Sequence, residues 1–138
     1  MRFMVIVKAS KDSEAGKMPT QKQLADMGKF NEEMVKAGMM LDGAGLKPSS
    51  KGARIVFKGG KATVVDGPFP ETEQLVAGYW IIQAKSLEEL KEWMKRCPEL
   101  HDGGGELEIR PLYELSDFEP GEGLKIHEKL DAEMKSQK

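Results

Sequence analysis

Asp66 is the residue of this chain whose sequence context best suits acid–base chemistry. It follows the apolar run 62–65 and is followed by Gly67 and Pro68. Glycine can adopt many φ values and proline has a fixed φ, so this order predicts a sharp exit from a strand. A carboxylate at such a strand end, near apolar side chains such as Phe69 and Tyr79, could serve as a general base. It could also accept local backbone N–H groups and hold its own turn, and the two roles are compatible.

A second group of polar candidates lies on the expected strand 106–115. Glu108 and Arg110 alternate there with Leu107 and Ile109, so the charged pair and the aliphatic pair should face opposite sides of a sheet. If the aliphatic pair faces helices, Arg110 faces the other surface and could bind an anionic substrate group through two hydrogen bonds. We favour the alternative that both charged residues pair with neighbours across the sheet or across a dimer.

Asp42 and Tyr79 are further candidates for the same cleft. Asp42 could form an acid–base couple with Asp66, although Asp-Gly is a common turn dipeptide and we favour the turn. Tyr79 and Trp80 face opposite ways on one strand. One of the two rings should lie in the core, and the other could form an aromatic wall for a planar ligand.

The remaining chemically active side chains do not form a recognisable site. Cys97 and the two histidines, His101 and His127, lack the spacing of a zinc site, so no metal is expected. We interpret Cys97 as a packed residue and both histidines as exposed ones, although His101 could take an acid–base role in its loop. The glycines at 43–45 and 103–105 match neither a dinucleotide fingerprint nor a P-loop, so no cofactor is predicted.

Composition limits the classes of partner. The chain has 138 residues, 39% of them hydrophobic, which is enough for one compact core. Charged residues make up 32% at a net charge of -2, so no surface for nucleic acid or an anionic membrane is expected. The basic residues between 47 and 61 are interpreted as a solvated hairpin. The absence of a spanning or secretory apolar segment and the single cysteine predict a cytoplasmic protein.

Hydrophobic periodicity and turn residues place these candidates on a series of elements. The expected order is a strand at 2–9, a helix from Thr20 to Gly38, strands at 39–46, 54–58, 61–66 and 76–84, a helix at 86–98 and a strand at 106–115. The strands at 54–58 and 61–66 flank a Gly-Gly pair and predict a hairpin. Residues 10–19 are expected to form a loop. A thin apolar stripe at 124–135 predicts a terminal helix that is docked on a partner or frayed.

Without the hairpin, the order is β-α-β-β-α-β, the ferredoxin-like arrangement of an α+β protein. Both helices should cover one face of the antiparallel sheet. The strand 76–84 is apolar on both sides, so the other face needs a partner, and a second copy related by a two-fold axis would supply it. We therefore expect a homodimer built from a domain at 1–115, with residues 116–138 as a C-terminal extension.

Several motifs in the same order resemble those of a known family. Asp-Gly-Pro-Phe-x-Glu-Thr at 66–72 is followed by Gly-Tyr-Trp-Ile-Ile at 78–82 and Glu-Ile-Arg-Pro at 108–111. This pattern resembles the YCII-related, or DGPF-domain, family of the dimeric α+β barrel superfamily. Glu73 departs from it, because a lysine is expected there. The resemblance implies a ferredoxin-like dimer with a cleft between sheet and loops, and no settled activity. The wider superfamily includes a dehydrochlorinase of hydroxylated aromatics, muconolactone isomerase and cofactor-free monooxygenases.

Two functions follow as hypotheses. In the first, the protein is a cofactor-independent enzyme acting on a small cyclic or aromatic oxygenated metabolite. Asp66 would move a proton, Arg110 would hold negative charge and Tyr79 would line the cleft. In the second, the protein is a non-catalytic ligand-sensing or protein-interaction module, because the loop at 10–19 and the acidic segment after Ser116 could order on binding.

Overall fold

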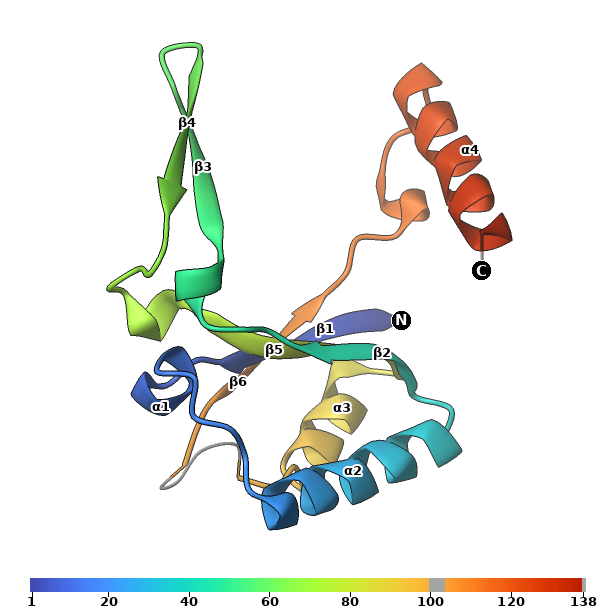
Figure 1. Cartoon of the computed structure of the whole chain (residues 1–138). Coiled ribbons are helices and arrows are strands. Elements are labelled where there is room, and N and C mark those ends of the chain that lie inside the picture. The colour runs from blue at the N-terminus through green and yellow to red at the C-terminus, as the bar shows by residue number, and fades with distance from the viewer. Residues whose placement is uncertain (100–103, 138) are drawn as a thin grey trace.

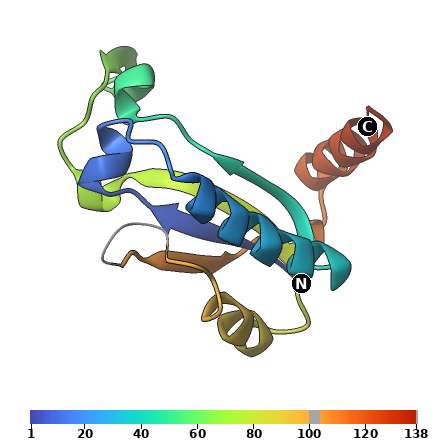
Figure 2. The same cartoon turned by 60° about the horizontal axis from the view of Figure 1, so that its bottom comes forward.

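The body of the protein is a four-stranded antiparallel sheet with two helices on one face (Figures 1 and 2). The computed structural model describes residues 1–99 and 104–137. The strands of this sheet are β1 (Arg2–Lys8), β2 (Met40–Gly45), β5 (Val76–Gln83) and β6 (Leu107–Pro111). Their order across the sheet is β2-β5-β1-β6, and every neighbouring pair is antiparallel. This is the ferredoxin-like topology expected from the element order.

The first covering helix, α2 (Gln21–Lys36), begins and ends at the predicted signals. The Thr20 side chain accepts a hydrogen bond from the backbone of Gln23, and the Gln23 side chain accepts one from the backbone of Thr20 (3.1 and 2.8 Å). The helix stops before Gly38, which has a φ of 72°. Its apolar stripe buries Phe30 and Met34 against the sheet.

The second covering helix, α3 (Leu87–Met94), buries Leu90 and Met94. The Ser86 hydroxyl accepts the Glu89 N–H at 3.1 Å, as predicted. The Glu89 carboxylate, however, accepts from the backbone of Lys85 at 3.3 Å rather than from Ser86, so the predicted capping box is only half formed.

The core lies between these helices and one face of the sheet. Trp80 is buried there; its ring meets Phe30 edge to face with centroids 6.3 Å apart. Its indole N–H donates to the Asn31 side chain at 2.9 Å, which satisfies a buried polar group. Because side chains alternate along a strand, Tyr79 faces the opposite side of the sheet. Leu107 and Ile109 pack against the core, as their alternation predicted.

The predicted hairpin forms a separate two-stranded sheet of β3 (Ala53–Lys58) and β4 (Lys61–Asp66). Its turn uses Gly59 and Gly60, with φ values of 58° and 78° that glycine adopts readily. The hairpin projects from the side of the main sheet that the helices leave open (Figure 1).

Several segments differ from the sequence-based expectations. Residues 10–19 were expected to be a loop but contain a short helix, α1 (Lys11–Glu14), because Ser10 and Ser13 cap each other reciprocally. The last strand ends at Pro111 rather than at residue 115, although Leu112 still donates its N–H to the Arg2 carbonyl at 2.9 Å. Short 3-10 turns occupy Ser49–Lys51 (η1), Thr72–Gln74 (η2) and Leu115–Asp117 (η3).

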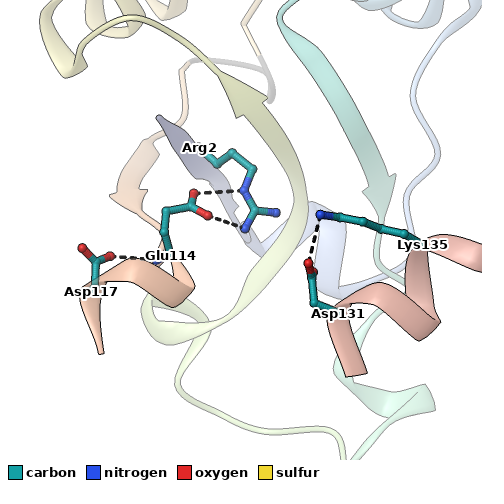
Figure 3. Close-up of polar contacts among 5 residues, drawn as sticks. All are labelled: Arg2, Glu114, Asp117, Asp131 and Lys135. Atoms are coloured by element: carbon teal, nitrogen blue, oxygen red, sulfur yellow. Dashed lines mark hydrogen bonds and ion pairs between the residues drawn. The ribbon is translucent and has the colours of Figure 1, made fainter. Parts of the chain in front are cut away.

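The C-terminal segment forms the helix α4 (Glu122–Ser136), slightly longer than predicted. It is joined to the body near the start of β1, where Glu114 accepts two hydrogen bonds from Arg2 at 3.0 and 2.8 Å (Figure 3). Like the hairpin, α4 projects from the open side of the sheet (Figure 1). No helix in the described part of the chain is long and apolar enough to cross a membrane.

Candidate functional site

The open face of the main sheet carries four of the five predicted site residues. Cross-strand pairing places these four residues and their apolar neighbours in two rows across the sheet. One row is Asp42, Ile81, Met4 and Arg110, and the next is Ala44, Tyr79, Ile6 and Glu108. Paired residues share a face, so this surface has an apolar centre and polar edges. Asp42 and Arg110 lie on opposite outer strands, three strand spacings or roughly 14 Å apart at the backbone.

Glu108 is the centre of a small ionic cluster on this face. It pairs with Lys8 across the sheet at 3.3 Å and with Arg110 on its own strand at 3.4 Å. The hydrogen bonds from Lys8 and then from Arg110 hold the pKa of the Glu108 carboxyl below its usual value. The Lys8–Glu108 pair is a cross-sheet pairing of the kind that the sequence favoured, whereas Arg110 pairs within its own strand. The Arg110 side chain remains 70% exposed, so its guanidinium is accessible on this face.

Asp42 is exposed on the outer strand β2, at a bulge between residues 40 and 42. Its carboxylate accepts a hydrogen bond from the N–H of Gly43 at 2.8 Å. Asp side chains make this kind of local contact with the backbone in turns, the role that the sequence favoured for Asp42. Tyr79 lies closer to the middle of the sheet, half-buried beside Ile6. The structure therefore places the aromatic ring between the acidic edge at Asp42 and the ionic cluster at Glu108.

Asp66 lies on the hairpin rather than on the main sheet, so the structure does not align it with Asp42. It is the last residue of β4, exposed, and opposite Ala53. The pairs Ile55–Val64 and Phe57–Ala62 lie on the same hairpin face as the Ala53–Asp66 pair, since each is two residues further along. Asp66 thus stands at the root of an exposed apolar face.

The Asp-Gly-Pro-Phe turn is held by Ser49 and Glu14. Gly67 donates its N–H to the Gly52 carbonyl, and Phe69 donates its N–H to the Ser49 hydroxyl, both at 3.0 Å. Ser49 in turn donates its backbone N–H (3.0 Å) and its hydroxyl to the Glu14 carboxylate. Among the described residues, neither turn N–H is bonded to the Asp66 carboxylate, which leaves that carboxylate available for another role.

Arg54 connects the hairpin with the segment after this turn. Its guanidinium lies over the Phe69 ring, 3.8 Å from the centroid, and pairs with Glu71 at 3.3 Å. Sequence reasoning did not identify Arg54, Ser49 or Glu14 as members of this region. No local spacing signals such contacts, because Glu14 and Ser49 are 35 residues apart.

A pocket of about 350 Å³ opens between α2 and the strands β2 and β5. Met27 and Asn31 of α2 line it, together with Trp80 and glycines at 43, 45 and 78. These glycines leave room because they lack side chains. Ala44 and Tyr79, which belong to the open face, also line this pocket.

The other candidate groups do not add to the site. Burial raises the pKa of the Cys97 thiol to about 11, as fits a packed residue rather than a nucleophile. His127 is exposed on α4, whereas His101 lies outside the described residues. In the ranges 1–99 and 104–137, no group of three or more histidine, cysteine, aspartate or glutamate side chains is arranged to hold a metal ion.

Comparison with known proteins identifies the family of this chain. A family model described as YCII-related domain matches residues 1–116. The chain belongs to the YCII-related family. An uncharacterized protein of Rhizobium meliloti (strain 1021) is 28% identical over 102 residues, covering 74% of this chain and 80% of that protein. The 5-chloro-2-hydroxyhydroquinone dehydrochlorinase of Burkholderia phenoliruptrix AC1100, solved with 2,5-dihydroxybenzoquinone, aligns with a TM-score of 0.48 and 12% identity, covering 86% of this chain and 100% of that one.

The YCII-related match includes the whole sheet, the hairpin and both covering helices. It stops at residue 116, inside η3, so α4 lies beyond it. The apolar centre of the open face, the ionic cluster and the Asp66 turn therefore belong to the YCII-related part of the chain, and the terminal helix lies outside that part.

Proposed function

We propose that this protein binds a small cyclic or aromatic oxygenated molecule at the open face of its sheet, and that a second copy covers this face. The observation that carries the proposal is the apolar floor beside the exposed guanidinium of Arg110. The floor consists of Met4, Ile6, Tyr79 and Ile81. An exposed apolar surface of this kind is typical of a ligand or protein interface.

The side chains of the face define the chemistry of the ligand. Tyr79 and the aliphatic floor favour a planar ring, and the Met4 thioether makes good contacts with aromatic edges. Arg110 can hold a carboxylate or phenolate oxygen, since a guanidinium binds two oxygens in its plane. Because the Arg110 guanidinium is exposed beside this floor, the face suits a ligand that carries a negative charge.

The catalytic version of the proposal gives Asp66 the role of acid or base. Asp66 would take a proton from a hydroxyl group or an acidic carbon of the ligand, and Arg110 would stabilise the resulting negative charge. The support is that the N–H groups of the turn donate to Ser49 and Gly52, so the Asp66 carboxylate does not accept these two hydrogen bonds. This chemistry needs only proton transfer, and we propose it without a cofactor.

The alternative is a non-catalytic module that senses a ligand or binds another protein. The projecting hairpin and α4 favour this alternative, because both expose apolar side chains away from the sheet. The two functions differ in whether the bound molecule is converted.

The test is a thermal-shift and turnover screen with hydroxylated benzoates and catechols. We expect some of these compounds to raise the melting temperature, and Arg110→Ala to weaken their binding by about 10-fold or more, as expected for the loss of a charge-assisted hydrogen bond. Lys95→Ala, which removes an exposed cation directly after α3, is the matched control and should leave binding unchanged. Equal binding by the Arg110 and Lys95 variants would contradict the proposed site.

Asp66→Asn separates the enzyme from the sensor. If Asp66 moves a proton, the variant should bind the ligand but convert it at least about 100-fold more slowly, as chromatography of the products would measure. Asp26→Asn, on the surface of α2, is the control. Undiminished conversion by a folded Asp66→Asn protein would exclude the catalytic role, and binding without conversion by the parent would favour the sensor.

A further inference from the structure

The terminal helix α4 exposes an apolar stripe on a side that its own chain leaves free. Ile126, Leu130 and Met134 follow at intervals of four residues, so they lie along one side; they are 60%, 44% and 56% exposed. Leu124 and Asp131 are the half-buried residues of the helix and mark its inward side. At 3.6 residues per turn, Leu130 lies about 100° around the helix from Asp131.

This helix needs a further contact surface. None of its 15 residues is buried, and a helix of this length is only marginally stable in water by itself. Within the chain, α4 packs mainly against η3. Its position is set at the Arg2–Glu114 pair, beside which Asp131 lies bonded to Lys135 (Figure 3).

The β3–β4 hairpin also exposes an apolar face. Ile55, Phe57 and Val64 share one of its faces and are 60%, 79% and 63% exposed. A lone two-stranded hairpin is marginally stable, and an exposed apolar strand surface favours association. The root of this face is Asp66, opposite Ala53.

The hairpin and α4 lie at opposite ends of the sheet in both views, yet both project from its open side (Figures 1 and 2). They are therefore too far apart to cover each other within one chain. Their charges are complementary. Residues 53–66 contain Arg54, Lys58 and Lys61 with a single carboxylate, whereas residues 114–137 contain seven carboxylates and three lysines.

We propose that the apolar stripe of α4 docks on the apolar hairpin face of a second copy of this chain. When two sheets face each other across a two-fold axis that exchanges their ends, the α4 of each copy reaches the hairpin of the other, and the contact forms twice. The proposal rests on the homodimer of the proposed function and names the segments that hold it together. Because Asp66 is at the root of the covered face, the docked helix restricts its access to water and each site contains parts of both copies.

Disulfide trapping tests the contact directly. In a Cys97→Ser background, Phe57→Cys chains and Leu130→Cys chains with different tags are co-expressed and oxidised. We expect a cross-link that joins one chain of each kind, visible on a non-reducing gel. Ala132→Cys, on another side of α4, replaces Leu130→Cys in the control and should not cross-link. A dimeric sample without the mixed cross-link, or cross-linking of Phe57→Cys chains to each other, would overturn the proposal.

Sedimentation over a dilution series provides an independent measurement. Leu130→Glu should weaken dimerisation by about 10-fold or more, because it places a charge at an apolar side chain that the partner's hairpin covers in the dimer. Ala132→Glu should change dimerisation little. Equal dissociation constants for the parent and Leu130→Glu would exclude α4 docking while leaving the sheet-to-sheet dimer intact. A parent protein that sediments as a monomer at tens of micromolar would remove both proposals.

Discussion

The backbone at Gly67 approaches Ser49 so closely that no side chain fits between them. A Cβ at Gly67 would lie 1.8 Å from the carbonyl oxygen of Ser49. The sequence suggested that Gly67 was needed for its freedom in φ, but it is not among the described glycines with positive φ. Close approach of two backbone segments is the reason for glycine here.

We predict that Gly67→Ala destabilises the protein by about 1–3 kcal/mol, the usual cost of forcing extra atoms into a packed site. Gly52→Ala is the matched control, because a Cβ there would meet the same carbonyl oxygen at an ordinary 3.7 Å. Urea unfolding of the two variants measures the difference. Equal free energies of unfolding would show that the turn can move away from Ser49.

Glu108 should make the stability of the protein depend on pH. Lys8 and Arg110 lower its folded pKa below the ordinary value of 4.5. The stabilisation is therefore present above about pH 4.5 and is lost as the pH falls through the lower, folded pKa. We predict that Glu108→Gln reduces the fall in the urea midpoint between pH 5 and pH 3, and that Glu119→Gln does not. Parallel acid profiles for parent and Glu108→Gln would contradict this ionic role.

At the scale of elements, Ser49 connects three segments that are separate in the sequence. Its hydroxyl and backbone N–H donate to Glu14 at the end of α1, and its hydroxyl accepts from Phe69 after the hairpin. The 3-10 turn η1 thereby fixes the root of the hairpin relative to the N-terminal segment. The direction of the hairpin, and with it the position of Asp66, depends on these bonds.

We predict that Ser49→Ala costs about 1–2 kcal/mol, because the Phe69 N–H and the Glu14 carboxylate each lose a partner. Ser50→Ala, next to it but exposed, is the control and should change stability little. Hydrogen exchange adds a local readout, since the Phe69 amide should exchange faster only in the Ser49 variant. Unchanged protection of that amide would mean that another acceptor replaces the hydroxyl.

At the scale of the whole molecule, the main feature is an imbalance between the two faces of the sheet. Two helices cover one face, while the other presents half-buried apolar residues with the hairpin and α4 rising beside it. A sheet with one solvated face normally carries polar residues there. The apolar centre of this face is therefore the strongest physical argument for a second copy.

We predict that light scattering gives about twice the chain mass of 15.3 kDa for the parent protein. Ile81→Glu should convert it to a monomer, since a charge in the middle of an apolar interface is costly to bury. Val35→Glu, at an exposed apolar position of α2, is the matched control and should remain dimeric. A dimeric Ile81→Glu protein would place the interface elsewhere.

Most of the elements could be predicted from the sequence because their signals are local. Reciprocal capping at Thr20 and Gln23, the Gly-Gly turn at 59–60 and the alternation around Glu108 each involve residues close in the chain. The element order then selected the ferredoxin-like topology. The short helix at 11–14 was missed because a serine pair gives a weaker capping signal than Ser or Thr with Glu or Gln.

Local patterns in the sequence predict most of the strands and helices. They also predict that Tyr79 and Trp80 face opposite ways, because side chains alternate along a strand, whereas the structure shows that Trp80 is the buried one. Only the tertiary structure decided that Ser49 rather than Asp66 holds the turn, and that Asp66 stands at the root of the apolar hairpin face. Those contacts join segments far apart in the chain. Their formation depends on the path of the whole backbone, which no local pattern encodes.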